Sequence, residues 1–227
     1  MKSKLPKKAK LNGCAGFSLV ELAVSAAILF LVIAGVAVVS SASDRAYRTG
    51  TTTAQLEEQA ATATDRIVAE LCIAGIDTFA VLPPAGNAVS DLQYLKAIGA
   101  EDGEVIWTGP RRLRLEKEPG ELDDGLDNNH NGLVDESQVV LIEEVGTADE
   151  RRLVLTRWVS ELAVGEVANG IDDNGNDLVD EPGFCVVRSG DTFAVRLSLQ
   201  RRDAGGRLLS RSAETSTCVR NRQGGGS

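Results

Sequence analysis

The sequence predicts an α+β protein in which one long N-terminal α-helix packs on a C-terminal antiparallel β-sheet. Three observations predict this fold class. An apolar run covers residues 22–39, apolar residues then recur every three or four positions up to residue 71, and short strand-like runs separated by turn signals follow from residue 105 to residue 199. We therefore expect a helix that is first wholly apolar and then amphipathic, followed by a β-rich domain.

The first sixteen residues form a basic segment without an acidic residue. Its five lysines are Lys2, Lys4, Lys7, Lys8 and Lys10. Without them the net charge falls from −9 to −14. A chain with this negative charge repels the phosphates of nucleic acids, and we therefore expect no nucleic-acid partner. The charge favours a divalent cation as the partner.

The apolar run from Leu22 to Val39 predicts a membrane-spanning helix. It is long enough to cross a hydrocarbon core, which takes roughly 17 to 25 residues, and no charge follows it before Asp44. Because basic flanks stay on the cytoplasmic side, everything after Ser43 is expected on the other side of the membrane. Small residues precede the apolar run instead of following it, which excludes an ordinary secretory signal, and no apolar core precedes Cys14, which excludes a lipoprotein signal.

The junction between the basic and apolar segments reads Gly16-Phe17-Ser18-Leu19-Val20-Glu21. It resembles the G-F-[ST]-L-[VIL]-E signal of type IV pilins and type II secretion pseudopilins. The resemblance implies cleavage between Gly16 and Phe17 by a prepilin peptidase, methylation of the new N-terminus at Phe17, and assembly with other pilins or pseudopilins through the N-terminal helix. It also implies a pilin fold. A carboxylate one turn into a membrane helix is costly, so Glu21 is expected to serve assembly by pairing with the amine of Phe17 on a neighbouring subunit.

Residues 44–75 are expected to continue the helix as an amphipathic arm. Its apolar positions are Leu56, Ala60, Ala63, Ile67 and Leu71. Gly50 with three threonines marks a weak point, and Gly75 is expected to stop the helix.

The strand-like runs beyond the arm predict an antiparallel sheet. They are Val105–Trp107, Leu113–Leu115, Val139–Ile142, Leu153–Val159, Phe184–Val187 and Phe193–Leu199. The last run alternates, so that Phe193, Val195, Leu197 and Leu199 should face the arm. Hairpin turns are expected at residues 189–191 and 203–206. The helix end and the tail Thr217–Arg222 are similar to minor pilins of the PilW type and to J-type pseudopilins.

Two acidic segments, residues 124–136 and 169–181, align without gaps at an offset of 45 residues. Alternating oxygen donors in a tight turn are what calcium prefers, so we expect two Ca²⁺ sites. The ligands of the first are Asp124, Asp127, Asn129, Asn131, the carbonyl of Leu133, Asp135 and Glu136. Those of the second are Asp172, Asn174, Asn176, the carbonyl of Leu178, Asp180 and Glu181.

The segments match an EF-hand only in part. Asp177 replaces the central glycine in the second copy, and Gln138 and Gly183 stand where the final bidentate glutamate belongs. We therefore expect isolated calcium loops of extracellular type, with dissociation constants on the order of 10⁻⁴ to 10⁻³ M. Two solvated Asn- and Asp-rich turns are the alternative.

The cysteines and the histidine do not indicate catalysis. A disulfide is expected between Cys185 and Cys218 in an oxidising periplasm, and Cys72 is expected to be a small buried residue. His130 is the only histidine and is expected to face solvent, so no serine or cysteine has an imidazole partner and we expect no enzyme.

The resemblance thus implies a structural subunit, a minor pilin or pseudopilin of the bacterial inner membrane, and the paired acidic segments add the expectation of a periplasmic, calcium-stabilised domain. The alternative is a membrane-anchored, calcium-dependent binding module that does not polymerise. The expected parts are a leader (1–16), a membrane segment (17–43), the arm (44–75), the β-rich domain (76–222) and a flexible tail (223–227).

Overall fold

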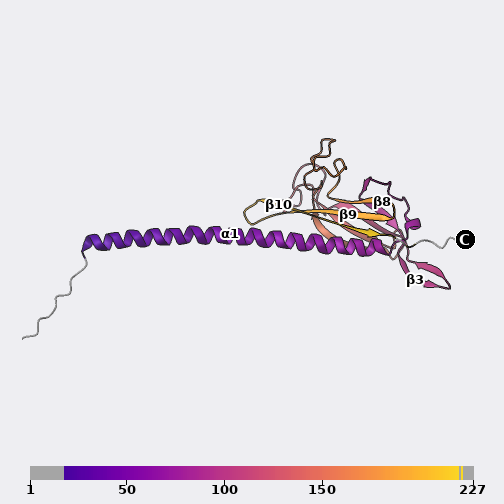
Figure 1. Ribbon diagram of the computed structural model, residues 1–227, viewed down its shortest axis with the longest axis horizontal. Helices are drawn as coiled ribbons and strands as arrows, with labels where there is room; N and C mark the ends of the chain where they lie inside the picture. Colours follow the sequence, from indigo (N-terminus) through magenta and orange to yellow (C-terminus); the bar gives the residue numbers. More distant parts are fainter. Residues whose placement is uncertain (1–17, 220, 222–227) are drawn as a thin grey trace, which may run out of the picture. The chain divides into compact units, whose positions relative to one another are not determined.

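The computed structural model describes residues 18–219 and residue 221. The predicted leader, the Gly16-Phe17 junction and the tail 223–227 lie outside the described residues. The chain divides into two compact units, Met1–Ala46 and Tyr47–Ser227. One helix, α1 (Leu19–Cys72), supplies the described secondary structure of the first unit and continues into the second (Figure 1).

Helix α1 begins with reciprocal hydrogen bonds between its first residues. The backbone N–H of Ser18 donates to Glu21 Oε2 at 2.9 Å, and the backbone N–H of Glu21 donates to Ser18 Oγ at 3.2 Å. This pairing is a capping box, which satisfies two backbone donors that have no partner within the helix.

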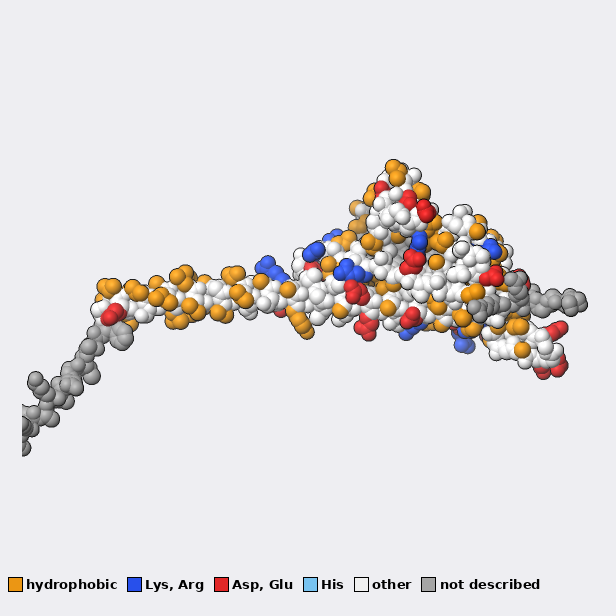
Figure 2. All heavy atoms as spheres, viewed as in Figure 1, with side chains coloured by type: hydrophobic (Ala, Val, Ile, Leu, Met, Phe, Trp, Pro, Cys, Tyr) orange, Lys and Arg blue, Asp and Glu red, His pale blue; other side chains and the backbone are white. Residues whose placement is uncertain are grey.

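The first part of α1 exposes its apolar side chains on every side. Its large apolar residues between Leu19 and Val39 are all exposed, and Figure 2 shows them as a continuous apolar surface along the helix. By length and composition α1 is able to cross a membrane. The expected apolar helix is therefore present.

The part of α1 in the second unit buries one face. Leu56, Ala60, Ala63, Ile67 and Leu71 are all buried, which confirms the predicted amphipathic arm. The helix ends at Cys72, before Gly75, which has an extended backbone instead of a left-handed helix-stop conformation. Gly75 is required for another reason, because the ring of Trp107 packs directly against it.

The second unit contains an eight-stranded antiparallel sheet and a separate two-stranded ribbon. The sheet order is β1-β8-β9-β7-β6-β5-β2, and β10 pairs with the other edge of β9. The strands of the sheet are β1 (Ala88–Val89), β2 (Asp91–Tyr94), β5 (Arg111–Lys117), β6 (Ser137–Glu143), β7 (Arg151–Val159), β8 (Phe184–Ser189), β9 (Thr192–Arg202) and β10 (Leu208–Cys218). The ribbon pairs β3 (Ala97–Glu101) with β4 (Glu104–Trp107), and a short 3-10 helix covers Ile76–Thr78.

All six predicted runs lie in strands, and the predicted turns join β8 to β9 and β9 to β10. The run Val105–Trp107 lies in the ribbon and is not part of the main sheet. The sequence therefore predicts the α+β class and its antiparallel sheet correctly.

One face of the sheet forms the core with α1. Phe193, Val195, Leu197 and Leu199 of β9 are fully buried, and Phe79 stacks on Phe193 with ring centroids 5.2 Å apart. The intervening residues of β9 point to the opposite face, where the long connections β5–β6 and β7–β8 cover them. The backbone N–H of Val164 donates to Ser198 Oγ, for example, and Ser198 is buried for this reason. The sheet thus separates the arm from the two acidic connections (Figure 1).

The predicted disulfide is wrong. Cys185 and Cys218 are both free thiols, and β9 lies between their strands. Across the sheet they are about 10 Å apart, and they pair with residues of β9 four positions apart, Arg196 and Thr192. A disulfide requires Cα atoms within about 7 Å. Cys72 differs from expectation too, because it is exposed at the end of α1.

Candidate functional site

Two loops with the same backbone carry the predicted calcium ligands. We define loop 1 as residues 120–136, between β5 and β6, and loop 2 as residues 165–181, between β7 and β8. Positive φ angles recur at five matched positions: Gly120 and Gly165 (93° and 97°), Gly125 and Gly170 (76° and 75°), His130 and Gly175 (63° and 75°), Gly132 and Asp177 (90° and 65°), and Asp135 and Asp180 (51° and 49°). The sequence repeat is therefore a structural repeat.

The repeat begins earlier than the sequence analysis placed it. Glu121 Oε1 accepts the backbone N–H of Asn129 at 2.7 Å, and Glu166 Oε1 accepts that of Asn174 at 3.0 Å. The sequence analysis missed both glutamates. They could have been found by extending the 45-residue offset toward the N-terminus, where Gly-Glu also repeats.

Asp127 organises the turn at the centre of loop 1. Its Oδ1 accepts the backbone N–H of Asn131 at 3.1 Å, and its Oδ2 accepts that of Gly132 at 2.8 Å. In loop 2, Asp172 accepts the N–H groups of Asn176 (3.2 Å) and Asp177 (2.8 Å) in the same way. The side chains of the two asparagines also accept hydrogen bonds from the backbone. Leu133 N–H donates to Asn131 Oδ1, and Leu178 N–H donates to Asn176 Oδ1.

Asp135 closes the loop instead of pointing to its centre. Its two carboxylate oxygens accept the backbone N–H groups of Asp124 (3.1 Å) and Gly125 (2.8 Å). Asp180 does the same for Asn169 and Gly170 in loop 2.

Asp124 makes a local turn by accepting Leu126 N–H at 3.0 Å, a role that Asn169 takes over for Ile171 in loop 2. An asparagine serves this position equally well, so the turn does not require the charge of Asp124.

The side chains of Asn129, Asn131 and Glu136 meet at the centre of loop 1. Glu136 is fully buried, and its Oε1 accepts hydrogen bonds from both amides, at 2.7 Å from Asn129. Loop 2 repeats the arrangement: Glu181 Oε1 accepts Asn174 Nδ2 at 3.0 Å and Asn176 Nδ2 at 2.5 Å. The structure therefore brings together three of the predicted ligands in each loop.

Loop 1 is the more buried of the two. Glu121, Asp135 and Glu136 are 6%, 5% and 0% exposed, whereas in loop 2 only Glu181, at 1%, is buried among the matching acids. Burial raises the pKa of the neighbouring Glu118, and repulsion from Glu136 and Glu121 raises it further. The hydrogen bond from the backbone N–H of Trp158 acts in the opposite direction and lowers it.

In loop 2 the pKa of Asp172 is shifted in the opposite direction to that of Glu118. Burial raises it, but the backbone N–H groups of Asp177, Gly175, Asn176 and Asn174 outweigh this effect, so that the pKa lies below the ordinary aspartate value.

Within the described residues no group of three or more His, Cys, Asp or Glu side chains is arranged to hold a metal ion. The side chains that meet at each loop centre are instead one glutamate and two asparagines. The carboxylate and amide oxygens of these residues suit hard cations such as calcium, whereas transition metals prefer imidazole or thiolate ligands.

No protein-family model, curated protein or solved structure matches the chain.

The second functional feature is the start of α1. Glu21, predicted to serve assembly, caps its own helix through Ser18, a role that the Ser-x-x-Glu spacing encodes and that the sequence analysis missed. A glutamine at this position keeps the side-chain acceptor and removes the charge, so the two roles can be separated.

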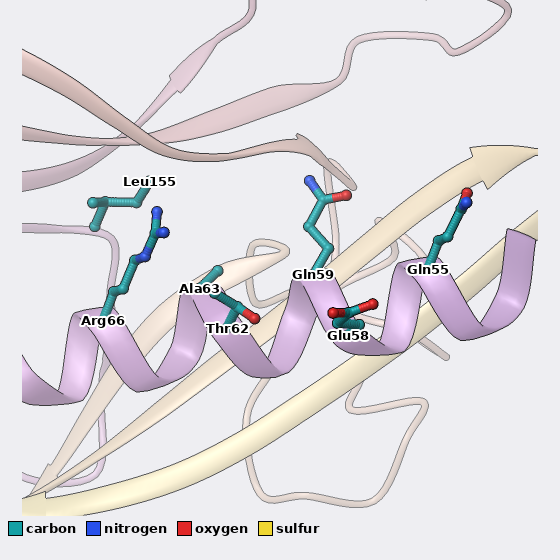
Figure 3. A pocket seen from close by; sticks show the side chains of 7 residues that line it. All are labelled: Gln55, Glu58, Gln59, Thr62, Ala63, Arg66 and Leu155. Atoms are coloured by element: carbon teal, nitrogen blue, oxygen red, sulfur yellow. The ribbon is translucent and has the colours of Figure 1, made fainter.

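A shallow groove lies on the arm beside β7 (Figure 3). Its lining residues are Gln55, Glu58, Gln59, Thr62, Ala63, Arg66 and Leu155. Figure 3 shows Gln59 and Arg66 extending from the helix toward the sheet, and Gln59 Nε2 donates to Thr156 Oγ1 at 3.2 Å. Most of the groove is therefore lined by polar side chains of the arm.

Proposed function

We propose that the chain is a structural subunit of the pilin and pseudopilin type, anchored in the bacterial inner membrane with its β-rich domain in the periplasm. One observation carries the proposal: after Glu21, α1 exposes an apolar surface up to Val39 that only Ser25 interrupts, whereas its last turns are part of the core of a folded domain. Such a helix needs lipid around its first part, or the equivalent helices of other subunits.

Processing by a prepilin peptidase would make this helix an assembly element. Cleavage after Gly16 removes the basic leader and leaves the apolar segment joined to the domain. After methylation, the new amine at Phe17 would pair with the carboxylate of Glu21 on a neighbouring subunit. Within lipid, an ion pair between neighbouring subunits favours one axial position of the helices over others, because any other position leaves a charge without its partner.

Two variants of Glu21 test assembly. Both Glu21→Ala and Glu21→Gln should be processed and remain in the membrane, and both should fail to fractionate with filaments or to crosslink through the N-terminal helix. Glu21→Gln is the decisive variant, since it retains the cap and removes only the charge. Normal assembly of Glu21→Gln would refute the role of the charge.

Normal behaviour of both variants, with no crosslinks in the wild type, would favour a membrane-anchored binding module that does not polymerise.

Processing has its own test. Mass spectrometry of the chain coexpressed with a prepilin peptidase should show loss of residues 1–16 and a methyl group on Phe17. Replacement of Gly16 by leucine should leave the precursor uncut. An unchanged mature mass in this variant would contradict the proposed cleavage site.

A further inference from the structure

Three buried carboxylate oxygens in the described part of the chain have no hydrogen-bond partner, and all three belong to the paired loops. They are Oε2 of Glu121, Glu136 and Glu181. The other oxygen of each carboxylate accepts neutral N–H groups, which offset only part of the cost of burial. An ionised carboxylate that is buried without a cation is disfavoured by several kcal/mol. Glu136 and Glu181 occupy the same position of the repeat, so the feature recurs with it.

Nothing within the loops neutralises these carboxylates. Neither loop contains a lysine or arginine. Lys117 contacts loop 1 at its periphery, where it pairs with Asp123 at 2.9 Å and donates to the carbonyl of Asp135. Arg202 donates to the carbonyl of Gly132. Both cations are held away from the oxygens of Glu136 by these other acceptors.

The unpartnered oxygen of Glu136 belongs to a side chain that points into the loop, because its other oxygen accepts both asparagine amides. A half turn of each amide about its Cβ–Cγ bond would replace nitrogen by oxygen at the loop centre. Asn131 N–H would keep Asp127 as its acceptor, whereas Leu133 N–H would lose Asn131 Oδ1, so binding of the ion has to outweigh the loss of that hydrogen bond. The centre would then offer the carboxylate and two amide oxygens, which are ligands that calcium accepts.

We propose that each loop binds one calcium ion at its buried glutamate, Glu136 in loop 1 and Glu181 in loop 2, with the two neighbouring asparagines as further ligands. Asp127 and Asp172 shape the turn around the ion. Asp135 and Asp180 close the loop over it. The proposal does not depend on filament assembly.

The two sites differ in strength, and loop 1 is the tighter. Glu118, which precedes loop 1, and Glu121 and Glu136 within it are all buried. The N–H of Glu118 donates to the carbonyl of Glu136 and the N–H of Glu121 to that of Glu118, so the three residues lie close together and a dication relieves more repulsion there. In loop 2 the remaining acids are more exposed. Arg196, whose Nε pairs with Glu214 at 3.1 Å, lines the same cavity as Glu181, so its positive charge weakens the attraction of this site for a cation.

The test uses the full-length chain in detergent micelles, freed of divalent ions with a chelator. Titration with CaCl₂ should show two binding steps by calorimetry and a rise in the melting temperature, with MgCl₂ much less effective because Mg²⁺ gives up its water reluctantly. No heat and no change in melting temperature up to about 10 mM calcium, ten times the weakest affinity expected of extracellular sites, would overturn the proposal.

Matched variants assign the steps. Glu136→Gln should remove the tighter step and Glu181→Gln the weaker one, and Glu104→Gln in the β3–β4 ribbon should change neither. Two wild-type steps in both loop variants would refute the ligand assignment, and loss of the tighter step in Glu181→Gln would refute the ranking.

If Glu136→Gln does not fold, Asn129→Ala and Asn174→Ala provide the same comparison at less buried positions of the loops. The first should weaken the tighter step at least tenfold and the second the weaker step. Unchanged affinities in both would refute the proposal.

Discussion

Substitution of Gly75 by alanine should destabilise the domain through one close contact. The backbone of Gly75 is extended, with φ −90° and ψ 127°, so alanine adopts it without strain. A Cβ atom there would lie 2.4 Å from Trp107 Cη2 and 2.6 Å from Thr78 Cγ2. Carbon atoms in contact are ordinarily about 3.5 to 4.0 Å apart, so the indole ring has to move by about 1 Å. Overpacking of this kind costs about 1 to 3 kcal/mol.

The same substitution at Gly50 should have the opposite sign. Gly50 lies within α1, and no atom lies within 4 Å of a Cβ built there. Alanine at this exposed position restricts the unfolded chain and favours the helix, so it should stabilise the protein by about 0.5 to 1 kcal/mol.

Urea unfolding of the full-length chain in detergent measures both effects. Tryptophan fluorescence includes emission from Trp107, the residue displaced by Gly75→Ala, and from Trp158, so the Trp158→Phe background isolates the ribbon signal. Far-ultraviolet circular dichroism reports on the helix. Wild-type stability of Gly75→Ala together with an unchanged emission spectrum would show that the ribbon does not pack on the end of α1. Destabilisation by Gly50→Ala would show that the helix does not continue through that position.

Three further predictions concern the core, the β9–β10 turn and the thiols. Ile67→Ala on the buried face of α1 should cost about 2 to 5 kcal/mol in urea unfolding, because Ile67 is fully buried; a smaller loss than 1 kcal/mol would mean that the arm is not part of the core. The backbone N–H of Arg207 and the hydroxyl of Thr49 lower the pKa of Asp203. The contribution of Asp203 to stability is therefore present above the ordinary aspartate pKa of about 3.9 and is lost as the pH falls through the lower folded value. Asp203→Asn should remove this part of the dependence of stability on acid, and identical pH profiles of the two proteins would contradict the prediction. Burial raises the pKa of the Cys185 thiol to about 12, whereas Cys72 is exposed. Iodoacetamide should therefore modify Cys72 and leave Cys185 unmodified in the native chain. Peptide mass spectrometry measures both, and equal modification of the two cysteines would contradict the prediction.

Local patterns carried most of the fold prediction. The apolar positions of the arm are three or four residues apart and all are buried, because a helix places such positions on one face whatever it packs against. The alternation in β9 predicted its buried face for the same reason.

Predictions that depended on distance between strands were less successful. Cys185 and Cys218 both lie in predicted strand regions, but their separation depends on β9 lying between β8 and β10, and no local pattern contains that order. Val105–Trp107 reads like the other strands and yet forms a separate ribbon, because strand pairing is decided by partners elsewhere in the chain. The spacing before Gly75 suggested a helix stop, whereas packing against Trp107 explains the glycine.

In the paired loops, too, some properties could be predicted from the sequence and others depended on the tertiary structure. The 45-residue offset, the alternating oxygen donors and the candidate ligands are properties of the sequence and can be read without knowledge of the fold. That Glu136 and Glu181 are the buried residues, and that Asp135 and Asp180 close the loops, was decided by tertiary structure. Burial depends on how each loop lies against the sheet, and contacts such as Arg202 with the carbonyl of Gly132 join residues 70 positions apart. A local sequence pattern specifies which oxygen atoms are available in each loop, but only the folded chain determines which carboxylates are removed from water.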